Sequence, residues 1–139
     1  MFQLTEGDAV ISIDLPNSKP NNDGGHCIFY RVGDKGLKLW ASYSLAKEQL
    51  LNQTRASLSN CGPKVLGDMV RVKGRMLYGF YTELAVLHKP TTHRDLVNLG
   101  RRFKRAFGFS YPDLHDDNIG HVNGKLVYID FDRFDLMRG

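Results

Sequence analysis

The sequence predicts an α+β fold with a mostly antiparallel sheet, and three observations lead to this prediction. Short alternating runs of β-branched and aromatic residues occupy the first third and the middle of the 139-residue chain. Two longer segments instead place apolar residues at the spacing of a helix. The pair Asn123-Gly124, between two further short runs, is the strongest two-residue signal for a hairpin. Strands joined by short turns pair antiparallel, which favours α+β over an alternating α/β fold.

The predicted strands are short and separated by turn-forming residues. Five of them are expected before the second helix, at residues 9–15, 26–32, 37–40, 65–72 and 76–84. A polar loop that contains Gly24-Gly25 separates the first two strands, and a turn at residues 33–36 leads into the third. Two further strands, at 119–122 and 125–129, flank the Asn-Gly turn.

Two helices are expected. The first runs from Ser44, which is expected to cap it, to about Ser59, before Gly62-Pro63 ends the segment. Its apolar face is expected to contain Leu45, Leu50 or Leu51, Thr54 and Leu58. The second helix is expected from Arg94 to Phe107. Its buried stripe is expected to consist of Leu96, Leu99, Phe103 and Phe107.

Positive charge is concentrated on this second helix, at Arg101, Arg102, Lys104 and Arg105. The interpretation that we favour is a solvated helix face, and the alternative is a docking face for an acidic protein or a nucleic acid. Nucleic acid is the less expected partner because the run is short and no exposed aromatic residues accompany it.

Composition predicts a soluble globular protein in the cytoplasm. Hydrophobic residues make up 42% and charged residues 24% of the chain, and the net charge is +4. The N-terminus lacks the pattern of a secretory signal, and no apolar run approaches the roughly 18 residues of a membrane span, so no membrane partner is expected. Cys27 and Cys61 are expected to be reduced thiols, with a disulfide as the alternative.

Oxygen-bearing side chains are expected to converge near the end of the chain. Asp113 and Asn118 lie five residues apart in a loop, and the Asn-Gly hairpin is expected to bring Asp130 back beside Asn118. Phosphoryl transfer requires a carboxylate near the attacking hydroxyl and Mg²⁺ held by hard oxygen ligands, and these three residues could supply both. A solvated acidic turn is the alternative for this loop. The nearby Asp116, Asp117, Asp132 and Asp135 are expected to be solvated or to support the site indirectly.

The stretch Asp113-Leu114-His115 with Asn118, followed by Ile129-Asp130-Phe131-Asp132, resembles the catalytic loop and metal-binding Asp of the protein-kinase-like superfamily. Its wording looks closer to aminoglycoside phosphotransferases and other kinase-like enzymes than to typical eukaryotic protein kinases. The short chain is also similar to reduced bacterial effector kinases such as OspG. The resemblance implies that Asp113 is the catalytic base, that Asn118 and Asp130 bind Mg²⁺, and that His115 contacts phosphate. Tyr111-Pro112 stands where His-Arg is usual, so control by activation-loop phosphorylation is not expected.

The resemblance also implies a kinase-like small lobe with a five-stranded antiparallel sheet and one helix. Lys38, on the third strand, would then contact the ATP phosphates together with Glu48 of the following helix. An edge-strand Lys38 facing water is the alternative. Gly24 and Gly25 would approach the phosphates, although no G-x-G-x-x-G is present. The backbone of Glu83, Leu84 and Ala85 would contact the adenine at the hinge.

The implied architecture is a single minimal kinase-like domain, with a small lobe and hinge at 1–85 and a truncated large lobe at 86–139 that holds one helix, the catalytic loop and the hairpin. Truncation is expected because seven residues follow Asp132. The implied function is ATP-dependent phosphoryl transfer, with Mg²⁺, to a protein serine or threonine hydroxyl. The alternative is a kinase-like nucleotide-binding module that acts by binding a partner protein. A protein substrate or an activating protein is the expected partner, and the resemblance to effector kinases leaves delivery into a host cell open.

Overall fold

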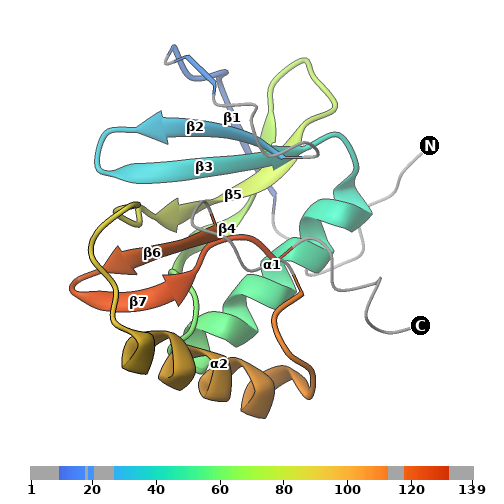
Figure 1. Ribbon diagram of the computed structural model, residues 1–139. Helices are drawn as coiled ribbons and strands as arrows, with labels where there is room; N and C mark the ends of the chain where they lie inside the picture. Colours follow the sequence, from blue (N-terminus) through green and yellow to red (C-terminus); the bar gives the residue numbers. More distant parts are fainter. Residues whose placement is uncertain (1–9, 18, 21–26, 113–117, 132–139) are drawn as a thin grey trace. The chain divides into compact units, whose positions relative to one another are not determined.

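The computed structural model describes residues 10–17, 19–20, 27–112 and 118–131 (Figure 1). These residues form an α+β fold, as predicted. In chain order its elements are β1 (Ile11–Ile13), β2 (Ile28–Val32), β3 (Lys35–Trp40), α1 (Tyr43–Leu58), β4 (Val65–Val72), β5 (Tyr78–Glu83), α2 (His93–Phe107), β6 (Ile119–Val122) and β7 (Lys125–Tyr128). The bounds differ from the predicted ones by a few residues at most, because turn residues separate almost every pair of elements.

The chain forms two compact units. The first consists of Met1–Leu50 and Leu66–Thr82, and the second of Leu51–Val65 and Glu83–Gly139. Helix α1 therefore begins in the first unit and ends in the second. The five-stranded sheet belongs to the first unit, apart from the outermost residues of β4 and β5, and helix α2 with the β6–β7 hairpin belongs to the second.

The five-stranded sheet has the order β1-β4-β5-β3-β2. Strands β2 and β3 pair antiparallel through the tight turn at Gly33-Asp34, with Phe29 opposite Lys38. Strand β1, however, pairs parallel with β4, with Ile11 opposite Val70. The prediction of an antiparallel sheet is therefore wrong at β1. No tight turn joins β1 to β4, so the sequence around β1 does not fix the direction in which it pairs.

The two faces of this sheet differ. Leu37 and Leu39 of β3 are fully buried in a cluster with Val70 and Val72 of β4. Alternation along β3 places Lys38 and Trp40 on the opposite face. There the Trp40 ring lies 5.5 Å from the ring of Phe80 in β5.

The start of α1 lies on the same face as Lys38. Tyr43, in its first turn, contacts Tyr78 edge-on, with ring centroids 5.6 Å apart. Tyr78 shares a face of β5 with Phe80, the ring partner of Trp40. Lys38 and the first turn of α1 thus occupy one side of the sheet.

Helix α1 begins and ends with local capping. The Leu45 N–H donates to Ser42 Oγ at 3.3 Å, so Ser42 rather than the predicted Ser44 caps the helix. At the other end Asn60 has a left-handed backbone (φ 59°), and the Cys61 N–H donates to the Ala56 carbonyl oxygen at 2.8 Å. This geometry is typical of a helix C-terminus.

The predicted buried face of α1 is wrong. Leu51 is 61% and Leu58 is 82% exposed, and Thr54 is also exposed. The buried residues are instead Tyr43, Ala46, Gln49, Asn52, Gln53 and Ala56. Two of the buried amides have partners inside the second unit: Asn52 Nδ2 donates to the Phe131 carbonyl oxygen at 3.3 Å and Gln53 Nε2 to that of Pro63 at 3.1 Å. Buried amides that are hydrogen-bonded in this way are tolerated, and an apolar periodicity does not reveal them.

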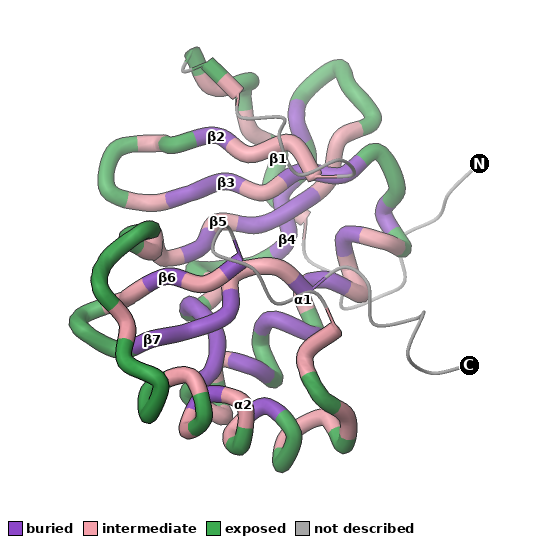
Figure 2. The backbone as a smooth tube through the Cα atoms, viewed as in Figure 1, coloured by how far each residue is buried: buried purple, intermediate pink, exposed green. Residues whose placement is uncertain are grey.

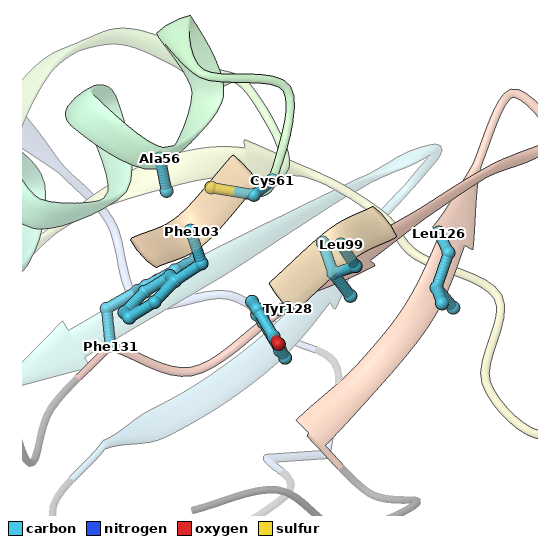
Figure 3. Packing of buried hydrophobic residues seen from close by; sticks show 7 residues of the cluster. All are labelled: Ala56, Cys61, Leu99, Phe103, Leu126, Tyr128 and Phe131. Atoms are coloured by element: carbon cyan, nitrogen blue, oxygen red, sulfur yellow. The ribbon is translucent and has the colours of Figure 1, made fainter. Parts of the chain in front are cut away.

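Helix α2 packs against the hairpin of β6 and β7, and its predicted stripe is confirmed. Leu99 and Phe103 are fully buried, with Leu96 and Phe107 packed beside them. Figure 3 shows how Leu99 and Phe103 meet the rest of the buried core, which consists of Ala56, Cys61, Leu126, Tyr128 and Phe131. Thr92 Oγ1 accepts the Asp95 N–H at 3.1 Å at the N-terminus, and Gly108 (φ 82°) closes the C-terminus. Each large side chain buried here contributes about 1.5–3 kcal/mol.

Neither cysteine forms a disulfide, as expected: Cys27 is half-buried and Cys61 is fully buried. Within the described ranges, no helix combines the length and the apolar character that a membrane crossing needs.

We predict that Gly79→Ala destabilises the protein and that Gly100→Ala stabilises it. A Cβ at Gly79 would lie 1.6 Å from the Lys38 carbonyl oxygen, so β5 would have to move away from β3. We expect a loss of about 1–3 kcal/mol or more, as for other overpacked positions. A Cβ at Gly100, in α2, has nothing closer than the Tyr128 hydroxyl at 3.8 Å, so better helix propensity adds up to about 1 kcal/mol. Denaturant unfolding measures both changes, and a stable Gly79→Ala would contradict the close approach of the two strands.

We also predict that stability falls at alkaline pH because of Cys61. Burial raises the pKa of this thiol from 9.0 to about 11, although the nearby Arg102 lowers it in part. Between these pH values the unfolded chain has lost the proton that the folded chain retains, so the free energy of unfolding decreases as pH rises through this window. Cys61→Ala should flatten this part of the stability profile, whereas Cys27→Ser should leave it unchanged. An unaltered profile in Cys61→Ala would show that the thiol is not responsible.

Candidate functional site

The β6–β7 hairpin brings Asn118 and Asp130 onto adjacent backbone segments, as predicted. Ile119 is paired with Tyr128, and beyond this pair the Ile129 N–H donates to the Asn118 carbonyl oxygen at 2.9 Å. The turn has positive φ at both central residues, 51° at Asn123 and 79° at Gly124. That geometry belongs to the tight hairpin turn that Asn-Gly favours, and it fixes the register of the two strands.

The segment that carries Asp130 is held from both sides. The Tyr111 hydroxyl donates to the Asp130 carbonyl oxygen, and Asn52 of α1 donates to that of Phe131. The Phe131 ring is 2% exposed and lies in the core of the second unit. The backbone before and after the Asp130 side chain is therefore fixed by hydrogen bonds and by a buried ring.

Tyr111, two residues before Asp113, connects the segment after α2 to the hairpin. Its ring stacks on that of Tyr128, with centroids 3.8 Å apart and planes 1° from parallel. Both rings also contact Phe103 of α2 edge-on, at 5.3 Å each. Sequence reasoning noted Tyr111 only as a departure from the kinase pattern and missed this contact. The one signal available was an aromatic residue next to Pro112.

The side chains of Asn118 and Asp130 have the chemistry of a cation site. Asn118 is 6% exposed and Asp130 is half-buried. An amide oxygen and a carboxylate suit Mg²⁺, which usually keeps several waters and takes only one or two carboxylates from a protein. Among the described residues, no group of three or more His, Cys, Asp or Glu could hold a metal ion.

Four of the site residues predicted from sequence lie outside the residues that the structure describes. They are Gly24, Gly25, Asp113 and His115. The acidic residues that were expected to be solvated lie outside them as well, namely Asp116, Asp117, Asp132 and Asp135.

Lys38 and Glu48 both belong to the first unit. Strand β3 lies between β5 and β2, so the alternative of an edge-strand Lys38 is wrong. The Lys38 side chain is half-buried and shares a face of the sheet with the start of α1. Glu48 is also half-buried, in the second turn of that helix.

The predicted hinge residues 83–85 begin with Glu83, the last residue of β5, at the start of the second unit's long segment. Glu83 is anchored to Lys64 twice, because its N–H donates to the Lys64 carbonyl oxygen at 3.0 Å and its Oε1 accepts the Lys64 N–H at 2.8 Å.

The segment after the hinge is tied to β6. Val86 and His121 exchange two backbone hydrogen bonds, at 2.8 and 2.9 Å. Gly120 allows this approach, because a Cβ there would lie 2.8 Å from the Cβ of Ala85. Sequence reasoning missed both the Glu83 anchor and the requirement for glycine at position 120.

Comparison of the chain with protein-family models, with curated proteins and with solved structures found no match.

We predict that Tyr111→Phe loosens the backbone at Asp130 without disturbing the aromatic stack. Phenylalanine keeps the ring against Tyr128 but removes the hydroxyl that donates to the Asp130 carbonyl oxygen. We expect a loss of about 1 kcal/mol of unfolding free energy and weaker Mg²⁺-dependent nucleotide binding. Tyr30→Phe, in β2 of the first unit, is the control and should leave nucleotide binding unchanged. Full nucleotide binding by Tyr111→Phe would show that the hydroxyl does not position Asp130.

Proposed function

We propose that this chain is an ATP-dependent phosphotransferase with a minimal kinase-like site, acting on a protein serine or threonine hydroxyl. One observation carries the proposal: the hairpin pairs the backbone of Asn118 with that of Ile129, so that an amide and the Asp130 carboxylate project from adjacent segments. In this proposal Asn118 and Asp130 hold Mg²⁺ at the nucleotide phosphates, with water completing its coordination.

Asp113 is the proposed catalytic base. It lies five residues before Asn118 in the sequence, the spacing at which the resemblance places a base before a metal ligand. The base orients the acceptor hydroxyl and takes its proton as the hydroxyl oxygen bonds to the γ-phosphorus. The bond from the γ-phosphorus to the β–γ bridging oxygen breaks in the same reaction, and ADP leaves. Bound Mg²⁺ would supply neutralisation of the phosphate charge.

Lys38 and Glu48 are proposed to act on the nucleotide from the first unit. The lysine ammonium binds phosphate oxygens and the Glu48 carboxylate orients it. This assignment is supported by the position of Lys38 on an inner strand, half-buried, on the side of the sheet where α1 begins. His115 is proposed to contact phosphate, the Gly24-Gly25 backbone to approach it, and the hinge backbone at residues 83–85 to bind the adenine.

Strand β3 offers a matched pair of lysines for testing the proposal. Lys35 and Lys38 lie on the same strand on opposite faces, and the ammonium of Lys35 lies 4.8 Å from the centroid of the Tyr81 ring. We predict that Lys38→Met lowers Mg²⁺-dependent phosphate transfer from labelled ATP by at least about 100-fold, since it removes a cation from the transition state. Lys35→Met should stay within about twofold of the parent chain. Equal losses in the two variants would contradict the role of Lys38.

The carboxylates are tested in the same assay, with cell lysate proteins as acceptors. We predict that Asp113→Ala lowers transfer by about 100- to 10,000-fold, as expected for loss of a general base. Asp130→Asn should weaken the Mg²⁺ dependence of ATP binding. The rise in melting temperature on adding ATP with Mg²⁺ measures this binding. Asp68→Asn, at an exposed position in β4, is the control. Nucleotide binding by the parent chain without transfer to any acceptor would favour the alternative, a binding module.

A further inference from the structure

The outer face of α2 carries a straight line of arginines. Arg94, Arg101 and Arg105 are all exposed and stand at positions i, i+7 and i+11 of the helix. At 100° per residue these positions fall within about 40° of one another, and at 1.5 Å per residue they span about 16 Å along the axis. Lys104 and Val97, also exposed, lie beside this line. Figure 2 shows exposed turns of α2 on the side away from the hairpin.

No carboxylate compensates this charge within the described part of the chain. The ion pair between Lys73 and Asp14 is in the first unit and involves no residue of α2. The one acid of α2 is Asp95, which lies about 100° around the helix from Arg94, at the N-terminal turn. The arginine line therefore presents a nearly uniform positive field on one side of the helix.

Two further cations extend this field toward the hairpin, and both are held by Asn60. Arg102 Nε donates to the Asn60 carbonyl oxygen at 3.1 Å, and Lys125 Nζ donates to Asn60 Oδ1 at 2.8 Å. Arg102 Nη2 also reaches the Leu126 carbonyl oxygen at 3.3 Å. The acceptor oxygens are neutral, so these hydrogen bonds do not cancel the positive charge of Arg102 and Lys125. Both charges can still attract a partner. We call the set Arg94, Arg101, Arg102, Lys104, Arg105 and Lys125 the α2 basic surface.

We propose that the α2 basic surface docks an acidic segment of a partner protein. This inference goes beyond the proposed phosphotransferase function and does not depend on it. Arginine guanidinium groups bind carboxylates with two parallel hydrogen bonds, which suits a segment with acidic residues repeated at helical spacing. Val97, exposed beside the arginines, offers such a segment an apolar contact as well.

The other anionic partners fit this surface less well. A membrane would require the apolar side of α2, but Leu99 and Phe103 are fully buried in the core of the second unit. A single strand of nucleic acid is normally bound by exposed aromatic rings in a basic groove. The exposed positions of α2 include no Phe, Tyr or Trp, and one helix presents a convex ridge rather than a groove.

The test measures binding of the full chain to a fluorescent peptide designed as a helix, with glutamates at positions i, i+7 and i+11 and a leucine beside them. The same peptide with glutamines in place of the glutamates is the second probe. We expect binding to the first peptide that weakens as salt is raised, and at least tenfold weaker binding to the second. The triple variant Arg94→Glu, Arg101→Glu, Arg105→Glu should lose at least tenfold in affinity.

The control variant changes the net charge equally elsewhere. Arg31→Glu, Arg71→Glu, Arg75→Glu alters three exposed arginines of the first unit and should stay within about threefold of the parent chain. If the α2 triple does not fold, the corresponding glutamine triple replaces it, and the same direction of change is expected. Equal losses in the α2 and control variants would overturn the proposal, as would tighter binding to a single-stranded oligonucleotide or to vesicles of anionic lipid than to the acidic peptide.

Discussion

The hydrogen bond from the Ile129 N–H to the Asn118 carbonyl oxygen closes the β6–β7 ladder at the end opposite its turn, and the candidate site depends on it. A shift of one residue in this pairing would turn every side chain of the strand to the other face. Asn118 would then lose its hydrogen bond from Ile129, and Leu126 and Tyr128 would leave the core beneath α2. The two-residue turn at Asn123-Gly124 fixes this register, because its left-handed backbone at both positions matches the twist of the strands.

The core of the second unit also holds the segment that carries Asp130 in place. Tyr111 and Tyr128 stack and both pack edge-on against Phe103, so that loop, hairpin and helix meet at one set of rings. Such aromatic pairs add about 0.5–1.5 kcal/mol each beyond the area that they bury. The Tyr111 hydroxyl donates a hydrogen bond to the Asp130 carbonyl oxygen, and the Asn52 amide donates one to that of Phe131. Packing and hydrogen bonding therefore act on the same short segment.

In the first unit the strongest constraint is the close approach of β5 to β3. Gly79 leaves no room for a side chain above the Lys38 carbonyl oxygen. Lys38 is thereby kept on an inner strand whose opposite face holds the fully buried Leu37 and Leu39.

The sequence by itself determined the elements and the juxtaposition of Asn118 with Asp130, since both depend on local turn chemistry and on short-range periodicity. It also predicted the buried stripe of α2, because Leu99 and Phe103 lie on the one apolar face that this helix can bury. Only the tertiary structure decided the parallel pairing of β1 and the inward face of α1, where Asn52 and Gln53 are buried and Leu51 and Leu58 are exposed. Those outcomes follow from hydrogen bonds between residues far apart in the chain, which no local pattern encodes. The same holds for Tyr111, whose partner carbonyl lies nineteen residues away.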